Sequence, residues 1–155
     1  MINKEFKDKL SEKKILIVGG SGFIGHNLSI KLASLGAEVH AVDNLQVNNL
    51  AFYTSSYLNN PNAERYISFI NSRLKLMRDN QVSLHIEDAR DYHRISKLID
   101  LIKPDTIVHL AAVAHANRSN KDPFSTFDHS LRTLENVLDA VKNLKTHLIY
   151  LSSSM

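Results

Sequence analysis

The chain has 155 residues, of which 43% are hydrophobic, and this is enough for one globular domain with a packed core. A net charge of +3, spread along the chain, gives no footprint of a nucleic-acid-binding protein, and the lack of cysteine excludes a disulfide framework and a thiolate metal site. No run approaches the ~18 apolar residues of a membrane span, and the charged start lacks the apolar core of a signal peptide, so we expect a cytoplasmic protein with no membrane partner.

Short helix and strand signals alternate from the start of the chain. Ile2, Phe6 and Leu10 recur every four residues in the polar lead 1–13 and predict a short helix that lies against the body. The lead is followed by a predicted strand over 14–18, a helix over 23–35 that ends at Gly36, and a strand over 38–42.

A long excursion, residues 44–81, separates the second strand from the third. Within it, apolar residues at helical spacing predict an amphipathic helix over 63–78. We favour a crossover helix that covers one face of the sheet, and the alternative is a lid over a ligand. The residues on the apolar face are Ile67, Ile70, Leu74 and Met77.

The remaining chain continues the alternation, and its strands are apolar throughout. Strands buried on both faces have this pattern, so the sequence predicts an α/β fold with a doubly wound parallel sheet in the order 3-2-1-4-5. A sixth strand is usual in such sheets, and we expect this one to be truncated after strand 5, which leaves an apolar edge. The predicted strands cover 82–87, 106–110 and 146–151, and the predicted helices cover 91–102 and 123–143.

The most informative motif is the run Gly19-Gly20-Ser21-Gly22-Phe23-Ile24-Gly25, which lies between the first strand and the following helix. A strand, a glycine turn and a helix place backbone N–H groups where a pyrophosphate can bind. Asp43 ends the next strand, where its carboxylate can accept from adenosine ribose hydroxyls and would repel a 2′-phosphate, which favours NAD over NADP. The alternative is a turn that packs the helix and binds nothing.

Polar and small residues also follow the other strands, and the topology brings them to one crevice. With the glycine run they form five segments that resemble the N-terminal part of an extended short-chain dehydrogenase/reductase, specifically of the NAD-dependent sugar-nucleotide epimerase/dehydratase group. The resemblance covers residues 14–155 and implies an incomplete NAD-binding Rossmann domain, without the substrate domain. The segments are Gly19-x-x-Gly22-x-x-Gly25, Val42-Asp43-Asn44-Leu45, Asp88-Ala89-Arg90-Asp91, His109-Leu110-Ala111-Ala112 and Tyr150-Leu151-Ser152-Ser153-Ser154-Met155.

The resemblance assigns the glycine run to the pyrophosphate of the cofactor. It implies that Gly19, Gly22 and Gly25 shape the turn. It also implies that Phe23 and Ile24 supply backbone N–H donors.

The next two matched segments are assigned to the adenosine part of NAD. The resemblance implies that Asp43 holds the ribose, with Asn44 beside it in the cofactor site. It implies that Asp88 accepts from the adenine amino group while the backbone of Ala89 meets the ring. As an alternative, Asp88 merely caps the helix that begins near Asp91.

The last two matched segments are assigned to the reacting end of the cofactor. The resemblance implies that Ala111 and Ala112 pass beside the nicotinamide ribose. It places Ser154 at the position of the catalytic Ser/Thr, where a hydroxyl can take part in proton transfer. The alternatives are ordinary strand-end packing for the alanines and a polar turn for Ser152 to Ser154.

The histidines do not indicate a metal site, because His109, His115 and His129 lack the usual metal-ligand spacing. His115 and Arg118 follow the fourth strand. There they either contact a sugar-nucleotide phosphate or are solvated loop residues.

Two departures from the family pattern bear on catalysis. The helix over 123–143 keeps one motif residue, Asn136, but has Ser130 where the family has an asparagine that props the active site. None of the five tyrosines has a lysine four residues further on, so these residues lack the Tyr-x-x-x-Lys pair of the family. In the family this tyrosine takes the sugar hydroxyl proton while hydride moves to the nicotinamide.

We interpret the chain as the NAD-binding portion of a sugar-nucleotide epimerase or dehydratase. We expect it to be inactive alone, and we expect the complete enzyme to act on a nucleotide sugar. The alternatives are a standalone, non-catalytic NAD-binding module and an atypical short-chain reductase on another substrate. The helices over 91–102 and 123–143 resemble those that pair in a homodimer of the family. On the second helix, Leu131, Leu134 and Leu138 lie on that face or in the core, and we favour the core.

Overall fold

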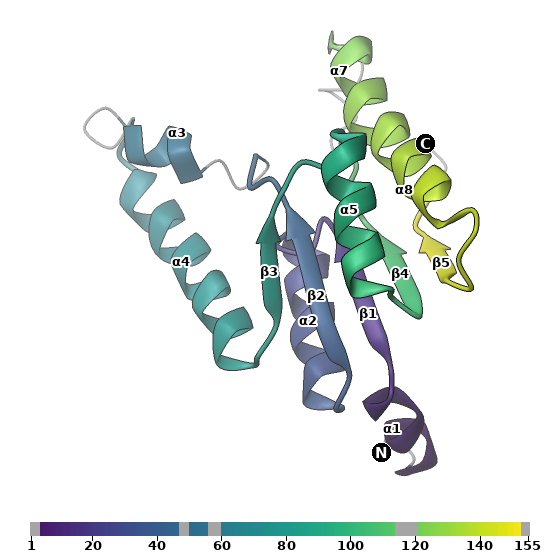
Figure 1. Ribbon diagram of the computed structural model, residues 1–155. Helices are drawn as coiled ribbons and strands as arrows, with labels where there is room; N and C mark the ends of the chain where they lie inside the picture. The colour runs from purple at the N-terminus through teal and green to yellow at the C-terminus, as the bar shows by residue number, and fades with distance from the viewer. Residues whose placement is uncertain (1–3, 47–49, 56–59, 114–120, 153–155) are drawn as a thin grey trace.

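The computed structural model describes residues 4–46, 50–55, 60–113 and 121–152 (Figure 1). These residues form a five-stranded parallel sheet in the order β3-β2-β1-β4-β5, which confirms the predicted fold class and strand order. The strands are β1 (Lys14–Val18), β2 (Glu38–Asp43), β3 (Ser83–Ile86), β4 (Thr106–His109) and β5 (His147–Tyr150).

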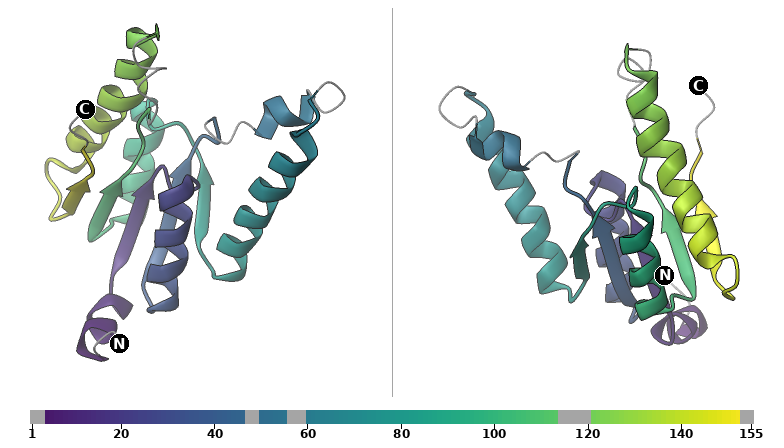
Figure 2. Two further views of the ribbon diagram at one scale, coloured as in Figure 1. Left: turned by 180° about the vertical axis from the view of Figure 1, so that it is seen from behind. Right: turned by 45° about the horizontal axis from the view of Figure 1, so that its top comes forward.

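The helices cover both faces of the sheet, with α2 and α4 on one side and α5 and α8 on the other (Figures 1 and 2). The predicted N-terminal helix is confirmed as α1, whereas α3 was not predicted. The helices are α1 (Lys4–Ser11), α2 (Phe23–Ser34), α3 (Leu50–Ser55), α4 (Ala63–Asp79), α5 (Tyr92–Ile102), α7 (Pro123–Phe127), the π-helical turn η1 (Asp128–Arg132) and α8 (Thr133–Val141).

The helix ends follow from local chemistry. Gly36, just after α2, has φ +99°, a conformation that glycine adopts without strain. Asp91 caps α5 by accepting from the backbone N of Arg94 at 3.1 Å. At its other end Lys103 adopts φ 51°, and Pro104 prevents the helix from continuing.

Alternate residues of the central strands divide the core into two clusters. Ile15 and Ile17 pack on the face covered by α2 and by Met77 of α4, and Leu16 and Val18 pack under α5 and α8. This burial on both faces is why the strands are apolar throughout.

The amphipathic helix in the excursion 44–81 is confirmed as α4, and its C-terminal half acts as a crossover helix. Met77 is buried against the sheet, and Ile70 is buried about two turns earlier. The N-terminal half of α4 leans away from the sheet and carries α3 (Figures 1 and 2). There Tyr53 and Tyr66 stack with their ring centroids 4.7 Å apart.

The predicted helix over 123–143 contains a π-helical turn that the sequence pattern did not predict. The hydroxyl of Thr133 lies at the end of this turn and donates to the carbonyls of His129 at 2.9 Å and of Ser130 at 3.2 Å. A π turn inserts one extra residue and so changes which side chains of the helix face the sheet.

The core position favoured for the three leucines is wrong for Leu131 and Leu138, whose exposed fractions are 51% and 48%. The stripe of α8 that meets the sheet consists instead of Thr133, Val137 and Val141, spaced four residues apart. The leucines lie on the adjacent stripe.

The apolar edge expected at the fifth strand is confirmed. Ile149, Tyr150 and Leu151 are exposed at β5, the outermost strand of the described sheet. Apolar strand edges of this kind are usually covered in native proteins.

His109, at the end of β4, is the largest buried polar side chain in the described core. Its Nε2 lies 3.4 Å from Thr133 Oγ1, and its Nδ1 has no partner of hydrogen-bonding geometry among the described residues. Burial lowers the pKa of His109 to about 4, and the nearby Ala111 backbone offsets this only in part. The imidazole is therefore neutral in the folded protein at neutral pH.

This burial predicts a loss of stability in acid. The pKa of His109 lies near 6.5 in the unfolded chain and about 4 in the folded one, so protons bind preferentially to the unfolded state between these pH values. A pKa shift of this size corresponds to roughly 3 kcal/mol of the free energy of unfolding. Denaturant unfolding should show that the free energy of unfolding of the wild type is lower at pH 4 than at pH 7. In His109→Phe this difference should be smaller. The exposed His147→Phe is the matched control and should leave the loss unchanged, and an equal loss in His109→Phe would contradict the account.

Candidate functional site

The glycine turn between β1 and α2 is packed against the ends of the neighbouring strands. The backbone N–H groups of Gly19 and Gly20 both donate to the carbonyl of Val42, at 2.9 and 3.2 Å. Gly19 has φ +82°, and a Cβ there would lie 2.9 Å from the backbone N of Ala111. A Cβ on Gly25 would lie 2.4 Å from the carbonyl O of Gly19. Gly19 and Gly25 therefore lie against backbone and have no room for a Cβ.

The N-terminus of α2 opens from this turn and has the properties of an anion site. Gly22 is the N-cap and has no side chain with which to satisfy the first N–H groups, and the first turn has no acidic residue. The side chains of Phe23 and Ile24 are 76% and 57% exposed. Free N–H groups and the positive end of the helix dipole together favour a phosphate at this position.

Asp43, the last residue of β2, connects two loops at the carboxyl edge of the sheet. Its Oδ2 accepts from the backbone N of Ser21 at 3.0 Å, and its Oδ1 accepts from the backbone N of Leu45 at 2.8 Å. Each carboxylate oxygen can accept more than one hydrogen bond, so ribose hydroxyls can be held as well. The structure thus places Asp43 directly beside the glycine turn.

Asp88 follows β3 and is held by Arg90 and Asn44. Its carboxylate accepts from the backbone N of Arg90 at 2.9 Å, from Arg90 Nη2 at 2.6 Å, from Arg90 Nε at 3.0 and 3.1 Å, and from Asn44 Nδ2 at 3.2 Å. Burial alone would raise the pKa of Asp88, but these hydrogen bonds outweigh it and lower the pKa to about 2. The alternative role of Asp88 as a helix cap is wrong, because Asp91 caps α5.

The donors around Asp88 occupy its acceptor positions. A carboxylate has about four lone-pair sites, and two groups of one arginine side chain, a backbone N–H and an amide already use them. An adenine amino group would therefore have to share or replace the longest of these contacts, the one from Asn44.

Arg90 extends this network to the long helix. Its Nη1 lies 2.9 Å from Asp128 Oδ2 and 3.2 Å from His129 Nε2, both in the π-helical turn. Asn136 donates from Nδ2 to the carbonyls of Ala89 and Arg90, each at 2.9 Å. The loop after β3 is therefore fixed to the long helix by two sets of contacts, those of Arg90 and those of Asn136. Asn136 thus has a structural role.

The exit of β4 lies beside the glycine turn. Leu110 donates its backbone N–H to the carbonyl of Val18 at 2.8 Å, which brings Ala111 against Gly19. Ser130 Oγ accepts from the backbone N of Val113 at 3.2 Å, so Ser130 supports this loop although it stands where the family has asparagine.

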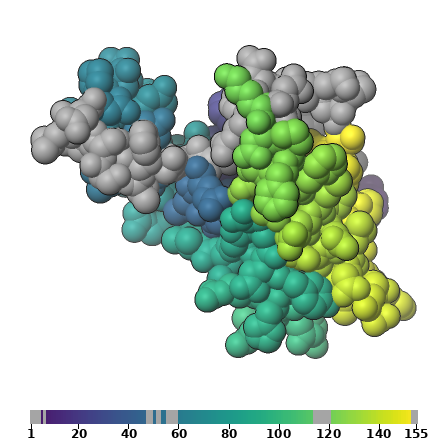
Figure 3. Space-filling view, turned by 90° about the horizontal axis from the view of Figure 1, so that it is seen from above, coloured from purple at the N-terminus to yellow at the C-terminus, as the bar shows by residue number. Residues whose placement is uncertain are grey.

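The structure brings most of the predicted site residues to one edge of the sheet, and it links them in pairs: Gly19 with Ala111, Ser21 with Asp43, and Asn44 with Asp88. Seen from above (Figure 3), the end of β2 lies between α3 and α4 on one side and α7 and α8 on the other. The residues at this edge are Gly19, Gly22, Phe23, Ile24, Gly25, Asp43, Asn44, Asp88, Ala89, Ala111 and Ala112. Ser154, His115 and Arg118 lie outside the described residues.

One residue at this edge was not predicted from the sequence. Arg73 of α4 donates from Nη1 to the carbonyl of Ser21 at 2.8 Å. It belongs to the excursion between the second and third strands, where only helical spacing was informative, and no local pattern shows that it reaches the glycine turn.

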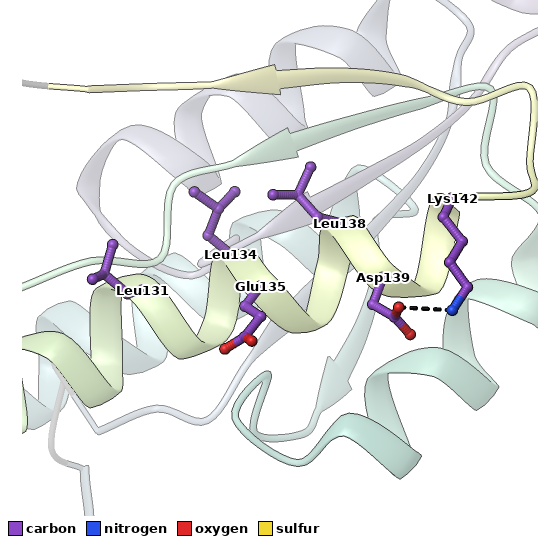
Figure 4. Close-up of a pocket in the computed structure, with 6 residues that line it drawn as sticks. All are labelled: Leu131, Leu134, Glu135, Leu138, Asp139 and Lys142. Carbon is purple, nitrogen blue, oxygen red and sulfur yellow. Dashed lines mark hydrogen bonds and ion pairs between the residues drawn. The ribbon is translucent and has the colours of Figure 1, made fainter.

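The described part of the chain holds no group of three or more His, Cys, Asp or Glu side chains that could bind a metal ion. None of its helices is both long and apolar enough to cross a membrane. An open hollow of about 590 Å³ lies away from the glycine turn, along α8. Its lining includes Leu131, Leu134 and Leu138 on one side of the helix and the ion pair of Asp139 with Lys142 (Figure 4).

The packing of the turn predicts a graded effect of alanine substitutions. Gly25→Ala places a Cβ against backbone that cannot move aside, so it should cost about 1–3 kcal/mol and displace the N-terminus of α2. Gly22→Ala is the control, because its Cβ would lie 3.2 Å from the nearest atom, the carbonyl O of Gly19. The melting temperature should fall further in Gly25→Ala than in Gly22→Ala. Equal falls would contradict this packing of the turn.

Known proteins share the fold described above. The model of the NAD dependent epimerase/dehydratase family matches residues 15–155. The UDP-glucose 4-epimerase of Lacticaseibacillus casei is 28% identical over 90% of this chain and 35% of its own length. The dTDP-D-glucose 4,6-dehydratase of Dictyostelium discoideum is 26% identical over 95% of this chain and 30% of its own length.

The fold is also similar to solved structures. The UDP-glucose 4-epimerase of Bifidobacterium longum, determined in complex with NAD⁺ and UDP, superposes with a TM-score of 0.69 at 22% identity, over 91% of this chain and 37% of that one. The chain spans only about a third of the length of the curated relatives given above. Because the family match covers nearly all of the chain, the chain belongs to the NAD-dependent epimerase/dehydratase family.

Proposed function

We propose that residues 14–155 are the NAD-binding part of a sugar-nucleotide epimerase or dehydratase. The observation that carries this proposal is the contact of Asp43 with Ser21, at 3.0 Å, directly beside the uncapped N-terminus of α2. This contact supports the proposal because it brings the carboxylate proposed for the ribose hydroxyls next to the N–H groups proposed for the pyrophosphate, at the carboxyl edge of a parallel sheet.

In this proposal, different residues bind different parts of NAD. The first N–H groups of α2, from Phe23 to Gly25, bind the pyrophosphate, and Asp43 accepts from the ribose hydroxyls. Ala111 and Ala112 let the nicotinamide end lie against backbone, since their side chains are small. When bound, NAD supplies the hydride acceptor, and the protein orients it.

We extend the proposal to a nucleotide-sugar substrate for the longer protein. The two curated relatives are named for UDP-glucose and for dTDP-D-glucose, which share a nucleoside diphosphate joined to a sugar. In this proposal Ser154 acts on a sugar hydroxyl, and the Tyr-x-x-x-Lys pair comes from residues other than these 155. A cytoplasmic location stays a prediction.

Surface composition favours this reading over a standalone NAD-binding module. The exposed edge residues of β5 lie near the leucine-lined hollow of α8. Even if a second copy covered the leucines, a chain that acted alone would leave Ile149, Tyr150 and Leu151 of the β5 edge in water, and such surfaces usually mark contact with further polypeptide. An atypical reductase is the remaining alternative, and a preference for NADP without nucleotide-sugar binding would favour it.

Calorimetry on the 155-residue chain tests cofactor binding. We expect NAD to bind, and Asp43→Asn to weaken binding about tenfold, because a charged acceptor for the ribose hydroxyls is lost. Asp79→Asn is the control, since it makes the same change in an exposed ion pair with Lys75 and should leave affinity unchanged. No heat and no melting shift with millimolar NAD, on folded protein, would refute the proposal.

We also propose that the leucine face of η1 and α8, formed by Leu131, Leu134 and Leu138, pairs with a second copy of the chain. Leu131 and Leu138 are about half exposed on this face, and Leu134 lies between them. Light scattering should show a dimer that becomes a monomer in Leu131→Glu/Leu138→Glu. Exposed Leu76→Glu, on α4, is the control and should leave the dimer intact. A monomeric wild type would remove the dimer from the account.

A further inference from the structure

The backbone N–H and the backbone carbonyl of Ser21, in the glycine turn, are each held by a charged side chain. Asp43 Oδ2 accepts from its N–H at 3.0 Å, and Arg73 Nη1 donates to its carbonyl at 2.8 Å. Ser21 is fully buried, and Arg73 is half-buried. The two charged side chains therefore meet at one buried residue of the turn.

The charges of Arg73 and Asp43 also act on each other. Burial lowers the pKa of Arg73, whereas the negative charge of Asp43 raises it. An arginine stays protonated in proteins, so the pair behaves as a fixed positive and a fixed negative charge in this part of the site.

Arg73 and Asp43 together change which dinucleotide is expected to bind at the adenosine ribose. A carboxylate alone at the end of the second strand repels a 2′-phosphate. A guanidinium carries five N–H donors and suits phosphate oxygens, so it can hold the Ser21 carbonyl and an anionic oxygen together. Because Arg73 and Asp43 contact the same residue, Ser21, the guanidinium supplies a positive charge beside the carboxylate proposed to hold the ribose.

We infer that Arg73 is a specificity-determining residue for the adenosine ribose, which offsets the charge of Asp43 so that the site accepts a 2′-phosphorylated dinucleotide as well as NAD. The inference rests on the proposed function, because it requires the glycine turn to bind a dinucleotide. It changes the expectation from the sequence, in which Asp43 alone favours NAD over NADP.

Titration calorimetry with NAD and NADP on the 155-residue chain tests the inference. In Arg73→Gln we expect affinity for NADP to fall about tenfold and affinity for NAD to fall only about twofold, since only NADP loses a charge-assisted contact. Arg73→Lys keeps the charge but not the planar fork, so its ratio of NAD to NADP affinity should lie between those of Arg73→Gln and the wild type.

Arg78→Gln is the matched control, because Arg78 is exposed near the end of the same helix and should leave both affinities unchanged. Should Arg73→Gln not fold, Arg73→Lys against the wild type decides alone. Equal losses for NAD and NADP, or no losses, would overturn the inference and leave Arg73 as a link between α4 and the turn. A wild type that binds NAD but shows no NADP binding would overturn it as well. A wild type that binds neither dinucleotide would overturn the proposed function and the inference together.

Discussion

The close approach of backbone to backbone at the first turn is the constraint on which the site depends. The carbonyl of Val42 accepts from two consecutive glycines, and Ala111 lies against Gly19 from the other side. This contact joins the ends of β1, β2 and β4, so the order of the strands in the sheet decides which loops can meet. The same contact directs the N-terminus of α2 toward the carboxyl edge, where its unsatisfied N–H groups can bind an anion.

Charged side chains hold the loops around this turn in place. Asp43 holds the backbone N–H of Ser21 and Arg73 holds its carbonyl, and Asp88 with Arg90 joins the loop after β3 to the π-helical turn. Asp88 and Arg90 form a part-buried ion pair with several hydrogen bonds, which is stronger than an exposed ion pair, and Asp43 and Arg73 each make a charge-assisted hydrogen bond to Ser21. The site therefore has a rigid frame in the described residues before any ligand is bound.

Much of the fold followed from the sequence, because the signals were local. Apolar strand runs, the glycine turn and Asp43 predict the sheet, its order and the pyrophosphate site without knowledge of distant contacts. The exact set of helical residues facing the sheet did not follow, because the hydroxyl of Thr133 accompanies a π turn that shifts the register of the long helix. For this reason the leucines lie beside the buried stripe rather than on it.

Contacts between distant segments were the part of the site that the sequence could not predict. Arg73 and Ser21 are 52 positions apart, and no spacing rule connects them. Asp88 was predicted as a ligand for adenine, and the structure shows that its acceptor positions are already used by Arg90 and Asn44. Both findings depend on how α4 and the loop after β3 pack. Local sequence patterns carry no information about this packing.

The central claim is that the N-terminus of α2 is the pyrophosphate site. Backbone amide NMR of the ¹⁵N-labelled chain during addition of NAD tests it most directly. We expect the largest chemical-shift changes at the amides of Phe23, Ile24 and Gly25, with smaller changes near Asp43. Changes confined to the hollow along α8, with the amides of α2 unaffected, would contradict it.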